Sequence, residues 1–233
     1  MRGAFVTGTD TGVGKTVVAS CIAAALRARG LRVAAVKPVV TGLDDPDPGR
    51  PADHELLAAA AGVAPSSVTT RTFGPPLSPH LAAELADAPL NPDELLTAAR
   101  ESAAGADVVI AEGAGGLMVP LVAGDEPYLI RDYALDLGLP LIIAARPGLG
   151  TINHTLLTIE AGRAHGLRVL GVVLTPWPDE RSVMQLSNRT TIASLGGVAV
   201  DVLPQVGLAP DALAAAGATL MVTELLTPAP ATT

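Results

Sequence analysis

The 233-residue chain contains only two lysines, and the first stands in a pattern that could bind phosphate. In the stretch VTGTDTGVGKTVV, Lys15 follows glycines at positions 8, 12 and 14 and precedes Thr16. Glycines allow backbone N–H groups to surround an anion, the lysine adds a point charge, and the threonine hydroxyl can reach a magnesium ion. The stretch therefore predicts a phosphate-binding loop, in a variant with five residues between Gly8 and Gly14 in place of the usual four.

The second lysine, Lys37, ends the apolar run RVAAVK and precedes Pro38, which favours an extended backbone. Arginine fills the other 13 cationic positions. A lysine kept in such a chain indicates a need for a compact, mobile charge at the ligand edge of a sheet. The alternative is a surface lysine whose stem covers apolar side chains.

Two carboxylates could complete this site, and one threonine at another helix start could serve a separate anion. Glu112 closes the apolar run DVVIAE, where a buried carboxylate is costly without a partner, and it could support magnesium. Asp53 opens DHELLAAAAG, and its local sequence fits a helix cap as well as a metal ligand. Thr151 in GLGTINHT could cap a helix or help to hold an anion there.

Short apolar runs rich in β-branched residues must position these groups. They alternate with alanine-rich helical patterns and lie at 4–7, 32–37, 107–112, 139–145, 168–174 and 198–203. Such runs are buried on both faces, so they predict an α/β fold with a doubly wound, mostly parallel sheet and a ligand site beyond the carboxyl ends of its strands. We expect one P-loop NTPase-like domain over residues 1–226 and a flexible tail over 227–233.

Composition narrows the choice of partners. The net charge of −8 argues against a surface for nucleic acid or an anionic membrane, and no apolar run approaches the length of a membrane span. The single cysteine, Cys21, lies in an apolar run, which indicates that it is a small buried residue. A lone cysteine without a disulfide partner also fits a reducing compartment. These features predict a cytoplasmic protein that acts on small molecules.

Five segments together resemble the dethiobiotin synthetases: GTDTGVGKT, KPVVTG, SPHLAAE, EGAGGL and LGTINHT. The resemblance implies a homodimeric ligase that uses ATP and Mg²⁺ to join CO₂, or bicarbonate, to 7,8-diaminopelargonic acid. In that reaction one amine forms a carbamate, ATP phosphorylates the carbamate, and the second amine closes the ureido ring of dethiobiotin. ADP and phosphate are released.

The loop pattern and the resemblance together assign roles to particular residues. Those expected to act in catalysis are Lys15, Lys37 and Thr11. Those expected to hold magnesium are Thr16, Asp53 and Glu112. Those expected to bind the substrate are Thr41, Gly150, Thr151, Ile152 and Asn153. Those expected to bind the nucleotide are Gly8, Thr9, Gly12, Val13, Gly14, Lys15, Thr16, Val17, Asp53, Glu112, Gly113, Ala114, Gly115, Thr175, Pro176, Pro204 and Gly207.

One position departs from the resemblance. Family members often place an asparagine after the strand that corresponds to RVLGVVL, whereas this chain has Thr175 and Pro176. Proline has no N–H, and a threonine hydroxyl cannot make a two-point amide contact with adenine. The substitution predicts loose base selectivity, so that other nucleoside triphosphates could replace ATP. Asn188, or the backbone near Pro204 and Gly207, is the alternative reader of the base.

Other functional classes fit the sequence less well. A partitioning or signalling ATPase would carry a lysine five residues before Lys15, where this chain has Asp10. A regulatory GTPase would need an Asn-Lys-x-Asp motif, and there is no third lysine to build it. An amidotransferase-type ligase that activates a carboxylate is the second choice, but it needs a glutaminase domain or partner for which 233 residues leave no room.

Overall fold

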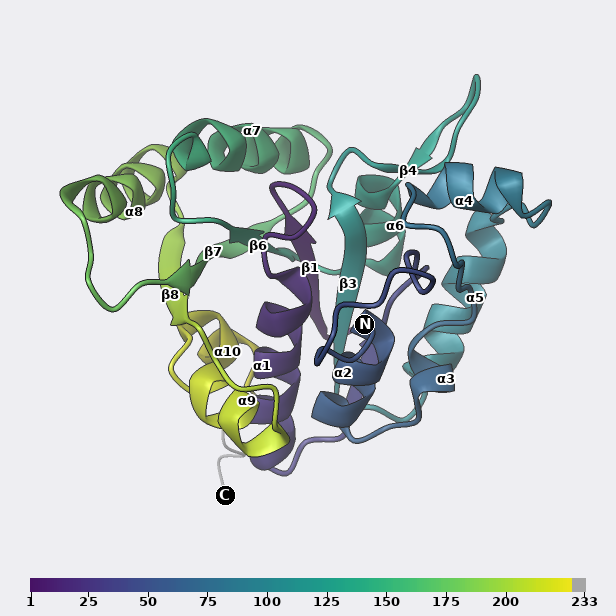
Figure 1. Ribbon diagram of the computed structural model, residues 1–233, viewed down its shortest axis with the longest axis horizontal. Helices are drawn as coiled ribbons and strands as arrows, with labels where there is room; N and C mark the ends of the chain where they lie inside the picture. The colour runs from purple at the N-terminus through teal and green to yellow at the C-terminus, as the bar shows by residue number, and fades with distance from the viewer. Residues whose placement is uncertain (228–233) are drawn as a thin grey trace.

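The computed structural model describes residues 1–227, and the predicted tail beyond Thr227 lies outside the described residues. Figure 1 shows a central sheet with helices on both sides. The strands are β1 (Gly3–Gly8), β2 (Val33–Val36), β3 (Val108–Gly116), β4 (Pro120–Val122), β5 (Tyr128–Leu129), β6 (Leu141–Ala145), β7 (Val169–Trp177) and β8 (Ala199–Pro204). The helices are α1 (Lys15–Ala28), α2 (Asp53–Ala61), α3 (Pro65–Val68), α4 (Pro79–Leu85), α5 (Pro92–Ser102), α6 (Ile130–Leu137), α7 (Thr151–Ala164), α8 (Val183–Gly196), α9 (Pro210–Gly217) and α10 (Met221–Leu226).

The main sheet has the strand order β2-β3-β1-β6-β7-β8, and all of its neighbours are parallel. Its faces are buried on both sides, as β1 shows: Val6 packs in one core with Ile22 of α1, whereas Phe5 packs in another with Tyr133 of α6. The predicted doubly wound parallel sheet in a single domain is confirmed. The antiparallel pair β4–β5 is an addition that the sequence patterns did not indicate.

The register of the strands brings the loops with chemistry to one edge. In β1, Val6 is paired with Glu112 of β3, and Gly8 is paired with Ala144 of β6. On the far side of β3, Val36 is paired with Ala111, so Lys37 follows β2 beside Glu112. The carboxyl ends of β1, β2, β3 and β6 therefore meet around the start of α1.

Helix α1 carries the glycine loop on a tightly packed base. Cys21 is fully buried on it, and burial raises the pKa of its thiol to about 12, as expected of a small core residue. Helix α9 packs closely against this segment: a Cβ at Gly217 would lie 1.9 Å from the carbonyl oxygen of Cys21. Only glycine allows this approach.

Neither of the helix caps that the sequence offered as alternatives is formed. The residue before α2 is Ala52, so Asp53 is the first helical residue, and its carboxylate is hydrogen-bonded to Thr16 and Lys37. Helix α7 likewise begins at Thr151 after Gly150, whose φ of 90° is the left-handed conformation that glycine adopts readily. The hydroxyl of Thr151 makes no cap hydrogen bond and lies 3.4 Å from that of Thr155.

Two strands are longer than their apolar runs. Strand β3 continues to Gly116, so Glu112 lies within it rather than at its end. Strand β7 continues to Trp177 and includes Thr175 and Pro176. Over residues 1–227, no helix is both long enough and apolar enough to cross a membrane.

Candidate active site

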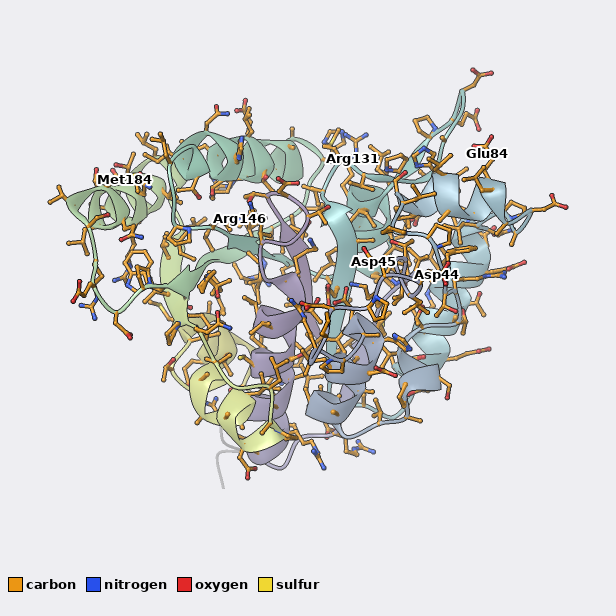
Figure 2. The ribbon with its side chains drawn as sticks, in the orientation of Figure 1. Asp44, Asp45, Glu84, Arg131, Arg146 and Met184 are labelled. Atoms are coloured by element: carbon orange, nitrogen blue, oxygen red, sulfur yellow. The ribbon has the colours of Figure 1, made fainter. Side chains whose placement is uncertain are left out.

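A cavity of about 550 Å³ opens at the carboxyl ends of β1, β2 and β3. The phosphate loop, the start of α2 and the loop 42–51 line it, and Figure 2 labels Asp44 and Asp45 on that last loop. The predicted site residues that line the cavity are Thr11, Gly12, Gly14, Lys15, Thr16, Lys37, Thr41, Asp53, Ala114 and Gly115. The structure thus collects them from four separate segments of the chain.

Four side chains form a hydrogen-bonded cluster at the base of this cavity. The Lys37 ammonium donates to Glu112 Oε1 at 2.6 Å and to Asp53 Oδ2 at 2.8 Å. The Thr16 hydroxyl lies 2.8 Å from Asp53 Oδ1 and 3.0 Å from Glu112 Oε1. The side chains of Lys37 and Glu112 are only 3% and 0% exposed, whereas that of Asp53 is 37% exposed toward the cavity.

The charges of the cluster depend on one another. Burial alone would lower the pKa of Lys37, but Glu112 and Asp53 outweigh it and raise that pKa, so the ammonium stays charged. Burial opposes ionisation of Asp53, yet Lys37 and the Thr16 hydroxyl hold its pKa at about 2. Burial also raises the pKa of the Glu112 carboxyl in spite of Lys37. For Lys15, burial and the nearby Lys37 lower the pKa against the pull of Glu112.

The cluster also tests whether a metal ion would fit. No group of three His, Cys, Asp or Glu side chains suited to a metal occurs among the described residues. A site of two carboxylates and one hydroxyl still matches magnesium, which prefers oxygen ligands and completes its shell with water and substrate phosphates. Glu112 Oε2 is buried without a hydrogen-bond partner, so its lone pairs are free to bind a metal ion. Thr16, Asp53 and Glu112 therefore fit Mg²⁺.

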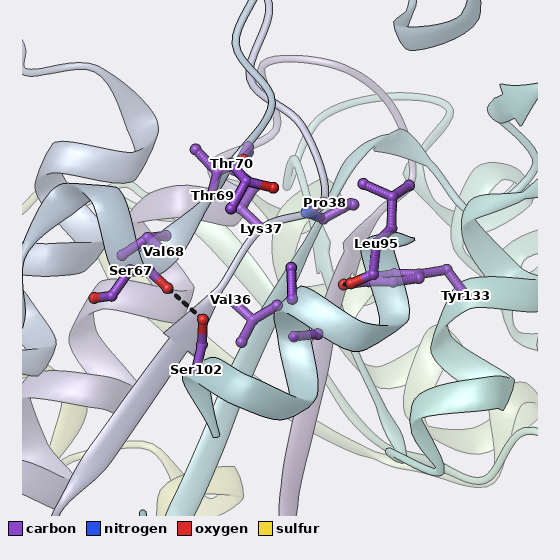
Figure 3. Close-up of a pocket in the computed structure, with 12 residues that line it drawn as sticks. Val36, Lys37, Pro38, Ser67, Val68, Thr69, Thr70, Leu95, Ser102 and Tyr133 are labelled. Atoms are coloured by element: carbon purple, nitrogen blue, oxygen red, sulfur yellow. Dashed lines mark hydrogen bonds between the residues drawn. The ribbon is translucent and has the colours of Figure 1, made fainter. Parts of the chain in front are cut away.

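The backbone fixes Lys37 from behind. Its amide donates to the carbonyl of Val68 at 2.8 Å. A small second cavity of about 10 Å³ lies on this side, next to Tyr133, and has room for about one water molecule. Figure 3 shows it bridged by the hydrogen bond from the Ser102 hydroxyl to the carbonyl of Ser67. This space is too small for a substrate, so the larger cavity is the candidate site.

The glycine loop is held by its own side chains. Lys15 Nζ donates to the carbonyl of Asp10 at 2.9 Å, and the amide of Thr11 donates to Asp10 Oδ1 at 2.7 Å. Gly14 has a φ of 91°, and a Cβ there would meet Thr175 Cγ2 at 2.7 Å. Both its conformation and this contact require glycine.

Several predicted residues lie outside the cavity. Gly8, Thr9, Val13, Val17, Glu112 and Gly113 belong to the loop, the strands and the helix α1 around it but do not line it. Two further groups that do not line it are the substrate residues Gly150, Thr151, Ile152 and Asn153 and the base-side residues Thr175, Pro176, Pro204 and Gly207. The substrate group lies at the start of α7, beyond the carboxyl end of β6.

Sequence reasoning missed one residue near the phosphate loop. Arg146 directly follows β6, and its guanidinium donates to the carbonyls of Thr11 at 3.3 Å and Gly12 at 3.4 Å. The sequence feature that could have identified Arg146 is its position directly after a buried strand, and Lys37 has the same kind of position. Asn188, the alternative base reader, instead donates its amide to the carbonyls of Pro147 and Gly148, each at 3.1 Å.

Comparisons with known proteins identify the family of the chain. A family model described as an AAA domain matches residues 2–208. The chain is 45% identical, over 84% of its length and 86% of the relative, to the ATP-dependent dethiobiotin synthetase BioD of Anaeromyxobacter dehalogenans. The chain belongs to the dethiobiotin synthetase family. The enzyme of the same name from Anoxybacillus flavithermus is 36% identical over 86% of this chain and 90% of its own.

Solved structures show how widely the fold of this dethiobiotin synthetase family member is shared. The cell division ATPase MinD of Pyrococcus furiosus superposes with a TM-score of 0.56 at 18% identity, over 97% of this chain and 100% of that one. A ParA family ATPase from Chlorobium tepidum gives 0.53 at 12% identity, over 97% of both chains. At these identities the likeness shows the fold alone.

Proposed function

We propose that the protein converts 7,8-diaminopelargonic acid, CO₂ and ATP into dethiobiotin, ADP and phosphate. As a member of its family it is an ATP-dependent ligase. One observation carries the choice of chemistry: a buried, charged lysine and two carboxylates meet beside a phosphate loop, on a cavity large enough for a substrate. We also propose a cytoplasmic enzyme without nucleic-acid or membrane partners, in keeping with its net negative charge.

The phosphorylation step has to bring together two anions, the carbamate and the γ-phosphate, which repel each other. One amine of the substrate adds to CO₂ and loses a proton, which gives a carbamate. A carbamate oxygen then bonds to the γ-phosphorus while the bond to ADP breaks, and the product is a carbamic-phosphoric anhydride. Lys15 and Lys37 supply fixed positive charge at this junction, where a loose phosphoryl-transfer transition state is stabilised by position and charge.

Ring closure needs no further activation. The second amine attacks the carbamoyl carbon, phosphate leaves with the electron pair of the broken C–O bond, and the amine loses its proton. Thr11 and the loop amides hold the phosphates in this proposal, and Thr41, which lines the same cavity, contacts the diamine or its carbamate. Thr16, Asp53 and Glu112 would hold Mg²⁺, which neutralises charge on the phosphate oxygens when bound.

The distal carboxylate of the substrate needs a separate anchor. Gly150, Thr151, Ile152 and Asn153 offer the N-terminus of the 14-residue helix α7 but do not line the cavity. We propose that they bind this carboxylate in the cavity of a second copy, so that the working enzyme is a homodimer. Leu149, which is 92% exposed just before this helix, marks the surface where the second copy would pack.

The test is product formation by the purified protein. With MgATP, bicarbonate and the diamine, we expect ADP release that depends on the diamine and a product with the mass of dethiobiotin. A matched reaction without the diamine should release little ADP. ADP release at the same rate without it would instead indicate an ATPase switch, and use of a carboxylate with glutamine would indicate the amidotransferase class.

A further inference from the structure

Arg146 lies on the edge of the phosphate loop but has no part in the chemistry described so far. It follows β6 directly, and Figure 2 shows it beside the loop after β1. One terminal nitrogen of its guanidinium is shared between the carbonyl oxygens of Thr11 and Gly12, at 3.3 and 3.4 Å. These two residues line the large cavity, whereas Arg146 does not. Its contact with the site is therefore made through the loop.

The backbone that carries Arg146 is fixed on both sides. On the strand side, the carbonyl of Ala144 accepts the amide of Thr9 at 3.1 Å. On the other side, the buried Asn188 of α8 donates to the carbonyls of Pro147 and Gly148. The guanidinium thus extends from a rigid segment rather than from a free loop.

These contacts set the direction of two backbone amides. In a trans peptide the C=O and N–H bonds point in opposite directions. The carbonyls of Thr11 and Gly12 point to Arg146, so the N–H groups in the same two peptides, which belong to Gly12 and Val13, point away from it. The amide of Thr11 is already used by Asp10. The amides of Gly12 and Val13 are the next donors along the loop.

We propose that Arg146 is a positioning residue that orients the Gly12 and Val13 amides toward bound triphosphate and adds positive charge behind the loop. The inference rests on the proposed function only in that this loop binds ATP. The positive charge of Arg146 also offsets the negative charge of Asp10, a carboxylate on the loop itself. Arginine suits the place because it is always charged and one terminal nitrogen carries two N–H groups, which can reach both carbonyls.

Direct binding of MgATP to the full-length protein tests this role. We expect Arg146→Ala to weaken binding about tenfold, the effect of losing hydrogen bonds to a charged group. Arg146→Lys should lie between this variant and the parent protein, since it keeps the charge without the fork of donors. Arg163→Ala is the matched control, because this exposed arginine also donates to a backbone carbonyl, that of Gly197, away from the loop.

Two further readouts separate positioning from other roles. In complexes saturated with MgATP, the amides of Gly12 and Val13 should exchange hydrogen faster in Arg146→Ala than in the parent protein, while the thermal midpoint of the nucleotide-free variant stays unchanged. In turnover, the KM for ATP should rise about tenfold while the KM for the diamine stays within about twofold. Unchanged MgATP binding in Arg146→Ala overturns the proposal. Weaker binding with unchanged exchange also overturns it, since that result means a direct contact with phosphate.

The same measurements distinguish this inference from the proposed function. If the parent protein binds MgATP and Arg146→Ala weakens it, but no dethiobiotin is formed, then the proposed reaction fails and the role of Arg146 stands. If dethiobiotin is formed normally and Arg146→Ala binds MgATP like the parent, then the role of Arg146 alone fails.

Discussion

Two regions of the molecule depart in opposite ways from the usual division between a polar surface and an apolar interior. At the phosphate-loop edge, Lys37 and Glu112 are ionisable groups with almost no exposed side-chain surface. At the α7–α8 side, Leu149 and Val183 are apolar residues that are 92% and 85% exposed. Figure 1 shows α7 and α8 beside β6–β8, at the opposite end of the molecule from α4 and α5.

From this contrast we expect each region to have a binding partner. Removing charges from water is expensive unless they are paired, and the phosphate-loop edge pairs them in a network with one carboxylate oxygen left over. Exposed apolar side chains that gather on one side typically mark a site of protein association. The first region is thus built for small charged ligands and the second for a protein surface, which we propose is a second copy.

The largest expected effect is that of Lys37→Ala. Loss of a fixed charge at the transition state should cost about 2.7–4 kcal/mol, or roughly a hundred- to a thousandfold in kcat/KM. Because the variant leaves Glu112 buried without its cation, we also expect a loss of about 3–5 kcal/mol in the free energy of unfolding. Steady-state kinetics and denaturant unfolding measure the two losses separately.

A second substitution separates the catalytic role of Lys37 from its structural one. In Lys37→Ala with Glu112→Gln, the buried charge is gone, so much of the stability should return. Activity should not return, because the cation that acts on carbamate and phosphate is still missing and Glu112, a proposed Mg²⁺ ligand, is altered as well; recovered stability without activity shows that the loss in Lys37→Ala does not come from unfolding. A single Lys37→Ala variant with near-normal turnover would rule out the catalytic role.

The sequence could predict the parts of the site that follow strands. Lys37 and Glu112 each stand at the end of an apolar run, and Lys15 ends the glycine loop that follows another; a parallel sheet brings such ends together. Asp53 could not be decided in this way, because a first-turn aspartate looks the same whether it caps a helix or contacts Lys37. Arg146 was missed because its partners are two backbone carbonyls, which no residue type in the sequence identifies; its position after a buried strand was the one available signal.

Base selectivity gives the next largest expected effect. Neither Thr175 nor Pro176 lines the cavity or carries a side-chain amide, and the Asn188 amide donates to the carbonyls of Pro147 and Gly148. A site without such base contacts discriminates weakly, so CTP, GTP and UTP should each support the reaction within roughly a hundredfold of ATP in kcat/KM. Rates at limiting concentrations of the four nucleotides measure this, and a preference for ATP above about a thousandfold contradicts it.

The exposed apolar residues on the α7–α8 side predict a dimer. A single charge introduced there should weaken it. Leu157 of α7 is 57% exposed, and we expect Leu157→Glu to weaken the dimer by about tenfold or more, because each copy would bury a charge. Leu225→Glu is the matched control, since Leu225 is also 57% exposed but lies on α10. Light scattering across a dilution series, with activity measured alongside, tests the pair. A parent protein that is fully active as a monomer contradicts the shared site.

The smallest expected effect concerns helix α1, which carries the phosphate loop at its N-terminus. Cys21 lies on the helix that begins with Lys15, is fully buried, and has a thiol pKa of about 12, far above the solution pH at which thiol reagents act. We expect no reaction with a thiolate-selective reagent in the folded protein and one equivalent after denaturation, because only the exposed thiolate reacts. Cys21→Ala should change the free energy of unfolding by about 1 kcal/mol and leave turnover unchanged. Rapid labelling of the folded protein would show that α1 and α9 separate readily at their contact, and the loop could not then be held by a rigid helix.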